Sequence, residues 1–353
     1  MTPHHSVTQA GHAKDIARRW VREEASRIPG AVGAFFHGSI TSLPNNETLP
    51  ATSDVDVMVV LDGPEPPPKP GKFLYRDVML EVSYLPAAQV RTPELVLGQY
   101  HLAGSFRAPG VIWDSSGRLT ALQSAVARDY AKRRWVQRRC EHARDKMLGG
   151  FPLDETDPFP DQVNAWLFPA AITTHVLLVA GLRNPTVRTR YIAARRLLTE
   201  YGHRELYAPL LALLGCAGMS QARAAHHLAA LTEAFDAAKS VVKTPFLFVS
   251  DISDTARPIA IDGSRELIDR GDHREAIFWM VATWTRCQMV FAHDAPAMAE
   301  RYDRGYRELL GDLGIASFAD LQRGKDQIAQ FTPRLWDVAQ AILAANPDIE
   351  VDD

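Results

Sequence analysis

The sequence predicts an α+β fold, in which a small β-sheet occupies the N-terminal third and a larger all-α domain follows it. Runs rich in β-branched and aromatic residues, typical of strands, lie early in the chain at residues 31–36, 55–61, 73–84 and 111–113. From Leu119 onward, long Ala- and Leu-rich segments dominate and strand signals nearly vanish. Strands followed by helices are the pattern of an α+β protein.

Chain length and one break in composition predict two domains. At 353 residues the chain is long for a single domain. The turn-like stretch 115–118 separates the last predicted strand from the first long helix. We therefore expect one domain at residues 1–117 and a helical domain at residues 118–353.

The elements of the first domain follow from local patterns. Apolar residues with helical spacing predict a helix over residues 10–28, which ends at a Pro-Gly pair and leads into the strand at 31–36. The proline-rich segment 63–71 should be a stiff connector between two strands, although it could also present a motif to a partner. A Thr-Pro pair at 92–93 should begin another helix.

The second domain should be a helical bundle. The Ala- and Leu-rich periodicity predicts helices at residues 119–148, 161–181, 186–201, 204–215, 220–242, 263–292, 296–311 and 332–345.

Two aspartates, Asp54 and Asp56, stand at the head of the strand predicted at 55–61. Side chains alternate along a strand, so the two carboxylates should share one face while Val55 and Val57 take the other. Adjacent carboxylates repel each other, and a divalent cation or a shared proton would offset the repulsion. The pattern therefore predicts a metal site. The alternative is that Asp54 caps a turn and Asp56 is an exposed strand residue.

A Gly-Ser turn, Gly38-Ser39, follows the first strand. Such a turn can present backbone N–H groups and a hydroxyl to a phosphate. Together with Asp54 and Asp56, it predicts a phosphate-binding turn beside a metal site.

This constellation resembles the nucleotidyltransferase superfamily that includes DNA polymerase β and the antibiotic nucleotidyltransferases. The family pattern of Gly-Ser, a spacer and Asp-x-Asp matches Gly38, Ser39, Asp54 and Asp56, and Ser53 before the first aspartate also fits. The resemblance covers roughly the first third of the chain. It implies a nucleotidyltransferase domain with a small mixed sheet and a nucleotide held by Gly38, Ser39 and Ser53.

A third carboxylate is expected from the resemblance on a neighbouring strand, and Glu81 in VMLEVSYL is the candidate. The sequence around it looks like the corresponding strand of the aminoglycoside adenylyltransferases that modify streptomycin and spectinomycin. Glu81 would accept the acceptor's proton, help to bind a metal ion, or both. Alternation with Leu80 and Val82 leaves open that it lies on a solvated strand face.

The spacer from Ile40 to Ser53 departs from the family pattern, because it is longer and contains Pro44 and Pro50. The prolines should cut short the helix that normally runs from the Gly-Ser turn. The expected result is either an extra loop at the rim of the site or an altered, inactive phosphate cradle.

Two charged segments each allow two interpretations. A basic stretch could be a solvated helix face or could meet a triphosphate; its members are Lys132, Arg133, Arg134, Arg138 and Arg139. The acid-rich segment 251–275 could be an ordinary loop and helix start, or could attract a polycationic substrate such as an aminoglycoside. His175 and Trp166 are expected to be core residues.

Composition limits the class of protein. Apolar content of 46% and charged content of 23% are ordinary for a globular protein, and a net charge of −3 makes a nucleic-acid partner unexpected. We expect no membrane span and no signal peptide. Three separated cysteines without metal spacing, at 140, 216 and 287, fit reduced thiols and a cytoplasmic location.

The resemblance implies a Mg²⁺-dependent adenylyltransferase, in which Asp54, Asp56 and Glu81 bind Mg²⁺ and ATP is the substrate. The acceptor would be a hydroxylated small molecule, first of all an aminoglycoside-like antibiotic, so that the activity would give antibiotic resistance. The helical domain would supply the acceptor site, with the substrate cleft between the domains. Two alternatives remain: a toxin-like enzyme that modifies a protein or tRNA, and a degenerate protein that only binds a nucleotide or partner. The oligomeric state is left open.

Overall fold

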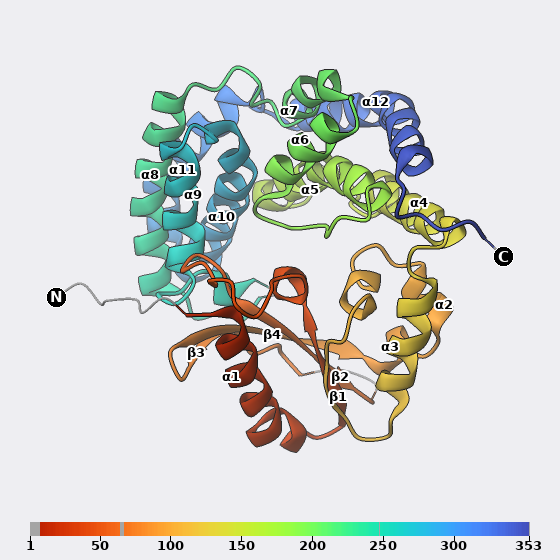
Figure 1. Cartoon of the computed structure of the whole chain (residues 1–353). Coiled ribbons are helices and arrows are strands. Elements are labelled where there is room, and N and C mark those ends of the chain that lie inside the picture. Colours follow the sequence, from red (N-terminus) through yellow and green to blue (C-terminus); the bar gives the residue numbers. More distant parts are fainter. Residues whose placement is uncertain (1–7, 64–66, 247, 353) are drawn as a thin grey trace. The chain divides into compact units, whose positions relative to one another are not determined.

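The computed structural model describes residues 8–63, 67–246 and 248–352. By its contacts the chain divides into two compact units, Met1–Arg139 with Glu350–Asp353, and Cys140–Ile349. The first contains a small mixed β-sheet and the second is mostly helical (Figure 1). The predicted α+β class is thereby confirmed.

Among its described residues, the first unit has a sheet of five strands in the order β3-β4-β2-β1-β5. Only β2 and β4 pair in parallel, and the other neighbours are antiparallel. Their bounds are β1 Ala31–His37, β2 Val55–Leu61, β3 Gly71–Tyr75, β4 Val78–Pro86 and β5 Val111–Asp114. The segment predicted as one strand at 73–84 is therefore a hairpin, because Arg76 and Asp77 adopt positive φ between β3 and β4. Of the proline-rich connector, residues 64–66 lie outside the described part of the chain.

The two faces of the sheet have separate cores. Helix α1 (Ala10–Glu23) lies along one face of the sheet (Figure 1). Its alanines and Trp20 belong to the same buried cluster as the valines of β2 at 55, 57 and 59. The opposite face packs against α2 (Pro93–Leu97), which Thr92 caps, and α3 (Arg118–Asp129). Asp56 alternates with the buried valines of the first face, as predicted for a strand. Its side chain therefore points to the opposite face of the sheet, which α2 and α3 cover nearer the end of β2.

Helix α3 belongs with the sheet and not with the helical unit. Its Leu119, Leu122 and Val126 lie in the same buried cluster as Phe35. The division into units consequently falls between Arg139 and Cys140, inside α4 (Arg133–Gly149), and not at 117/118. The helix predicted over 119–148 is α3 and α4, with a break at 130–132 where Ala131 and Arg133 pair with Glu350.

The helical unit continues with α5 Phe159–Ala180, α6 Arg190–Glu200, α7 Tyr207–Leu213, α8 Gln221–Val241, α9 Gly263–Asp269, α10 His273–Asp294, α11 Pro296–Asp312 and α12 Phe318–Ala345. Helices α5 and α10 are buried along most of their length and form its centre. The helix predicted over 263–292 breaks at Gly271, whose φ is 90°.

The last helix begins earlier than predicted, at Phe318 instead of residue 332. Ser317 and Asp320 form a reciprocal capping box that starts it, and the helix then runs through Pro333. The capping box therefore sets the start of the helix.

Among the described residues, one helix, α5, is long and apolar enough to cross a membrane, which differs from the expectation that no such run exists. Of its most apolar 18-residue window, 89% is buried inside the protein. Its apolar character is accounted for by its place in the core.

Candidate metal and phosphate site

One transverse row of side chains crosses four strands of the sheet. Lys72 of β3 pairs with Glu81 of β4, Glu81 with Asp56 of β2, and Asp56 with His37 of β1. Residues directly opposite each other in paired strands share a face of the sheet. Strand pairing thus brings together charged and polar groups that are far apart in the sequence.

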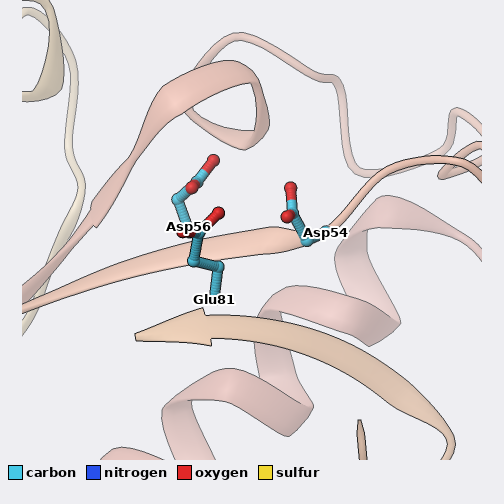
Figure 2. Close-up of side chains that lie close together, drawn as sticks. All are labelled: Asp54, Asp56 and Glu81. Carbon is cyan, nitrogen blue, oxygen red and sulfur yellow. The ribbon is translucent and has the colours of Figure 1, made fainter. Parts of the chain in front are cut away.

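Three carboxylates converge at this row. Asp54 directly precedes β2, and Figure 2 shows its side chain with those of Asp56 and Glu81 rising on one side of the strands. One oxygen from each carboxylate lies within 4.8 Å of the other two. The side chains are partly accessible, with 17% of Asp54 and 20% of Glu81 exposed. Oxygen ligands at this spacing could hold a divalent cation.

The Gly-Ser turn lies directly over Asp56. Gly38 begins a short 3₁₀ turn, η2 (Gly38–Thr41), with φ of 66°. A Cβ atom at Gly38 would lie 2.1 Å from the Asp56 Oδ2 atom, so no other residue fits without displacing the carboxylate. Ser39 follows in the same turn and is exposed. The turn and the carboxylates therefore form one site.

The long spacer from Ile40 to Ser53 is folded against α1. Lys14 of α1 donates to the Leu43 carbonyl at 2.6 Å, and the Gly11 and Ala10 amides donate to carbonyls at 45 and 47. Ile40 is buried in the core between α1 and the sheet. As predicted, no long helix follows the Gly-Ser turn. The spacer ends in a turn in which the Ser53 backbone amide donates to the Pro50 carbonyl. Asp54 follows this turn directly, at the start of β2.

Burial and mutual repulsion raise the free energy of the ionised forms of Asp54 and Asp56. Burial raises the pKa of Asp54 to about 6, with repulsion from Glu81 adding to the shift and the Lys72 ammonium opposing it. The pKa of Asp56 is raised well above its ordinary value by burial first, and then by Asp54 and Glu81. A cation bound among the three groups would relieve this cost.

Two lysines and a histidine at the site were not predicted from the sequence. Lys72 and Lys69 form ion pairs with Glu81. Burial lowers the pKa of His37 to about 4, so the ring is neutral at pH 7, and its Nδ1 atom lies 2.7 Å from the Ser105 hydroxyl. Lys72 lies between buried Gly71 and partly buried Phe73 on a short strand, which is a weak signal, and the pairing of β3 with β4 places it beside Glu81.

The basic stretch forms no single charged face. Arg139 is buried, where it donates to the carbonyls of Leu97 and Tyr130 and lies over the Tyr130 ring. Arg134 pairs with Asp352, and Lys132 with Asp129.

The acids of segment 251–275 are largely engaged in internal ion pairs. Asp251 pairs with Arg286, Asp254 with Lys239, and Glu275 with Arg195. Most of the negative charge expected to attract a polycation is thereby offset within the helical unit. His175 and Trp166 are buried, as expected for core residues.

The helical unit also contains a cavity of about 280 Å³. Trp166 and Leu313 contribute apolar walls, and Asp320, Arg323 and Gln327 contribute polar groups. This cavity is distinct from the carboxylate site, since all its lining residues belong to the second unit.

A scan of the chain against protein-family models finds no match, and a search of curated proteins finds none either.

Proposed function

We propose that this protein is a Mg²⁺-dependent nucleotidyltransferase that transfers AMP from ATP to a hydroxyl group of a small molecule. The observation that carries the proposal is the convergence of three carboxylates beneath a glycine turn, on the adjacent parallel strands β2 and β4. Carboxylates that repel one another in a partly buried place are costly for a fold, and metal binding gives them a use.

The proposed reaction joins the acceptor oxygen to the α-phosphorus of ATP and breaks the bond from that phosphorus to the bridging oxygen of the β-phosphate. The acceptor hydroxyl loses its proton to solvent water, and pyrophosphate leaves. Asp54 and Asp56 would hold Mg²⁺, which neutralises charge that develops on the phosphates. Gly38 and Ser39 would hold the triphosphate through the backbone and hydroxyl of the turn, with Ser53 at the other end of the spacer.

Glu81 would complete the metal site in this proposal. Both of its carboxylate oxygens already contact ammonium groups, Oε1 that of Lys69 and Oε2 that of Lys72. We assign Glu81 the ligand role because one of its carboxylate oxygens lies within 4.8 Å of oxygens of Asp54 and Asp56.

Aminoglycoside-like antibiotics are the first acceptor class to test. The suggestion rests on the sequence resemblance, since the acids of segment 251–275 are mostly paired internally. The degenerate-protein alternative is disfavoured because the spacer, its main support, packs against α1 and leaves the Gly38 turn over Asp56.

The test is pyrophosphate release from ATP and Mg²⁺ across a panel of aminoglycosides and other hydroxylated antibiotics. Acceptor-dependent release that is lost in the Asp54→Asn/Asp56→Asn variant, with that variant shown to be folded, would support the proposal. If the protein binds ATP–Mg²⁺ but no acceptor in the panel gives pyrophosphate release, the search moves to macromolecular acceptors. Transfer of label from ATP labelled at the α-phosphate would then identify the acceptor. Failure to bind ATP would overturn the proposal.

A further inference from the structure

A lysine ammonium lies inside the carboxylate cluster. Lys72 Nζ is 3.3 Å from Asp54 Oδ2 and also contacts Glu81 Oε2. Only 5% of the Lys72 side chain is exposed. Its position is set by the sheet, because Lys72 pairs directly with Glu81 across the β3–β4 ladder.

A charge count indicates what this ammonium does. When ionised, Asp54, Asp56 and Glu81 carry three negative charges, and the ammonium groups of Lys72 and Lys69 offset two of them. One divalent ion added to this arrangement leaves a single positive charge. The carboxylates alone would need two divalent ions to reach the same balance. The two lysines therefore supply the charge of a second divalent ion.

We propose that Lys72 is a resident cation of the site, which holds the place between Asp54 and Glu81 that a second divalent ion would take, so that the protein binds one ion and not two. The inference rests on the proposed function in one respect, namely that the carboxylates bind a divalent metal. The single ion would bind the Asp56 carboxylate, under the Gly38 turn, together with Asp54 and Glu81.

The repulsion within the cluster supports this assignment. Asp54, Asp56 and Glu81 each bring an oxygen within 4.8 Å of the other two, and the Lys72 ammonium contacts two of these three carboxylates. Removing the ammonium should leave the carboxylates to attract a further cation in its place.

Counting bound Mn²⁺ on the full-length chain tests the inference without reference to turnover. The electron paramagnetic resonance signal of free Mn²⁺ gives the stoichiometry, and calorimetry with Mg²⁺ gives the affinity. We expect one ion in the wild type, two in Lys72→Met, which keeps side-chain length without charge, and one in Lys72→Arg, which restores the charge. The first ion should bind Lys72→Met more tightly by on the order of tenfold.

The outcomes separate this inference from the proposed function. Two ions in the wild type, or an unchanged stoichiometry and affinity in Lys72→Met, would overturn the role of Lys72 and leave a metal-dependent transferase intact. One ion in the wild type without nucleotidyl transfer would overturn the proposed function and leave the inference standing. No Mn²⁺ binding at all would overturn both. The wild-type count decides between one and two ions even if Lys72→Met fails to fold.

Discussion

The raised pKa of Asp54 gives the metal-free protein a pH dependence opposite to that of an ion-paired surface carboxylate. Its pKa is about 6 in the folded protein against 3.8 ordinarily, so the folded state binds the proton more tightly. The stability that this group contributes is therefore fully present below pH 3.8. As pH rises from there through 6, about 3 kcal/mol of the free energy of unfolding is lost. Asp56 shifts in the same direction.

We therefore expect the wild type in EDTA to lose stability between pH 4.5 and 7 relative to Asp54→Asn/Asp56→Asn. Denaturant unfolding of both proteins across this range measures the difference, and other titrating groups cancel in the comparison. Mg²⁺ should stabilise the wild type more at pH 7.5 than at pH 5, since it binds ionised carboxylates. A wild type that gains stability relative to the double variant as pH rises would contradict this account.

The Gly38 backbone is fixed by two separate constraints, and a second glycine allows them to be separated. Gly117 has φ of 78°, similar to the 66° of Gly38, but a Cβ there would meet nothing within 4 Å. Gly117→Ala should therefore show only the cost of the left-handed backbone, about 1 kcal/mol. Gly38→Ala should cost more, because it also displaces the Asp56 carboxylate.

Chemical denaturation and Mn²⁺ titration of the two alanine variants check this prediction. We expect Gly38→Ala to weaken Mn²⁺ binding and Gly117→Ala to leave it unchanged. Equal effects of the two substitutions on metal binding would mean that the close approach of Gly38 to Asp56 has no importance for the site.

In helix α10, the acidic residue of the first turn, Glu275, is buried and not exposed to solvent. Glu275 is 1% exposed and accepts from Arg195 Nη1 at 2.6 Å and from the Tyr207 hydroxyl at 2.5 Å. Asp254, in the same acid-rich segment, is 88% exposed and pairs with Lys239 at the surface. The two acids should therefore contribute very differently to stability.

Glu275→Gln should lower the free energy of unfolding by about 2 kcal/mol, because it weakens buried, charge-assisted hydrogen bonds. Asp254→Asn should leave the unfolding midpoint unchanged within error, as is usual for surface ion pairs. Urea titrations of both variants measure the contrast. A larger loss of stability in Asp254→Asn than in Glu275→Gln would contradict the buried pairing of Glu275 and the surface pairing of Asp254.

Local sequence patterns predicted the position of most helices and strands, but few of the residues at which they begin and end. β1, β2 and β5 were predicted from short β-rich runs, and α5 and α8 from apolar periodicity. The predicted helices at 119–148 and 263–292 each proved to be two, since backbone pairing with Glu350 in one case and a left-handed glycine in the other interrupts them. Both interruptions leave the apolar pattern almost continuous.

At the scale of the whole molecule, every carboxylate of the triad belongs to the first unit. We therefore expect Mg²⁺ alone to slow amide hydrogen exchange in β1, β2 and β4 and to leave α5 and α10 unaffected. Mass-spectrometric exchange with and without Mg²⁺ measures this, with Asp54→Asn/Asp56→Asn as the control. Protection in α10 that the double variant retains would indicate a different metal site.

The sequence by itself determined the α+β class, the order of strands before helices, and the candidate site at Gly38, Asp54, Asp56 and Glu81. Spacing along the chain accounts for Asp54, Asp56 and Gly38, since alternation puts Asp56 opposite the buried valines and a Gly-Ser pair makes a turn, whereas Glu81 was expected from the family resemblance. The catalytic and nucleotide-binding roles of these residues stay predictions.

Only the tertiary structure decided which distant residues share the site and how charges are matched. Pairing of β3 with β4 puts Lys72 among the carboxylates, packing of α3 on the sheet moves the unit boundary, and ion pairs offset the acids of segment 251–275. Each depends on contacts between residues far apart in the chain. Such contacts are fixed by strand register and core packing, which composition and local periodicity do not encode.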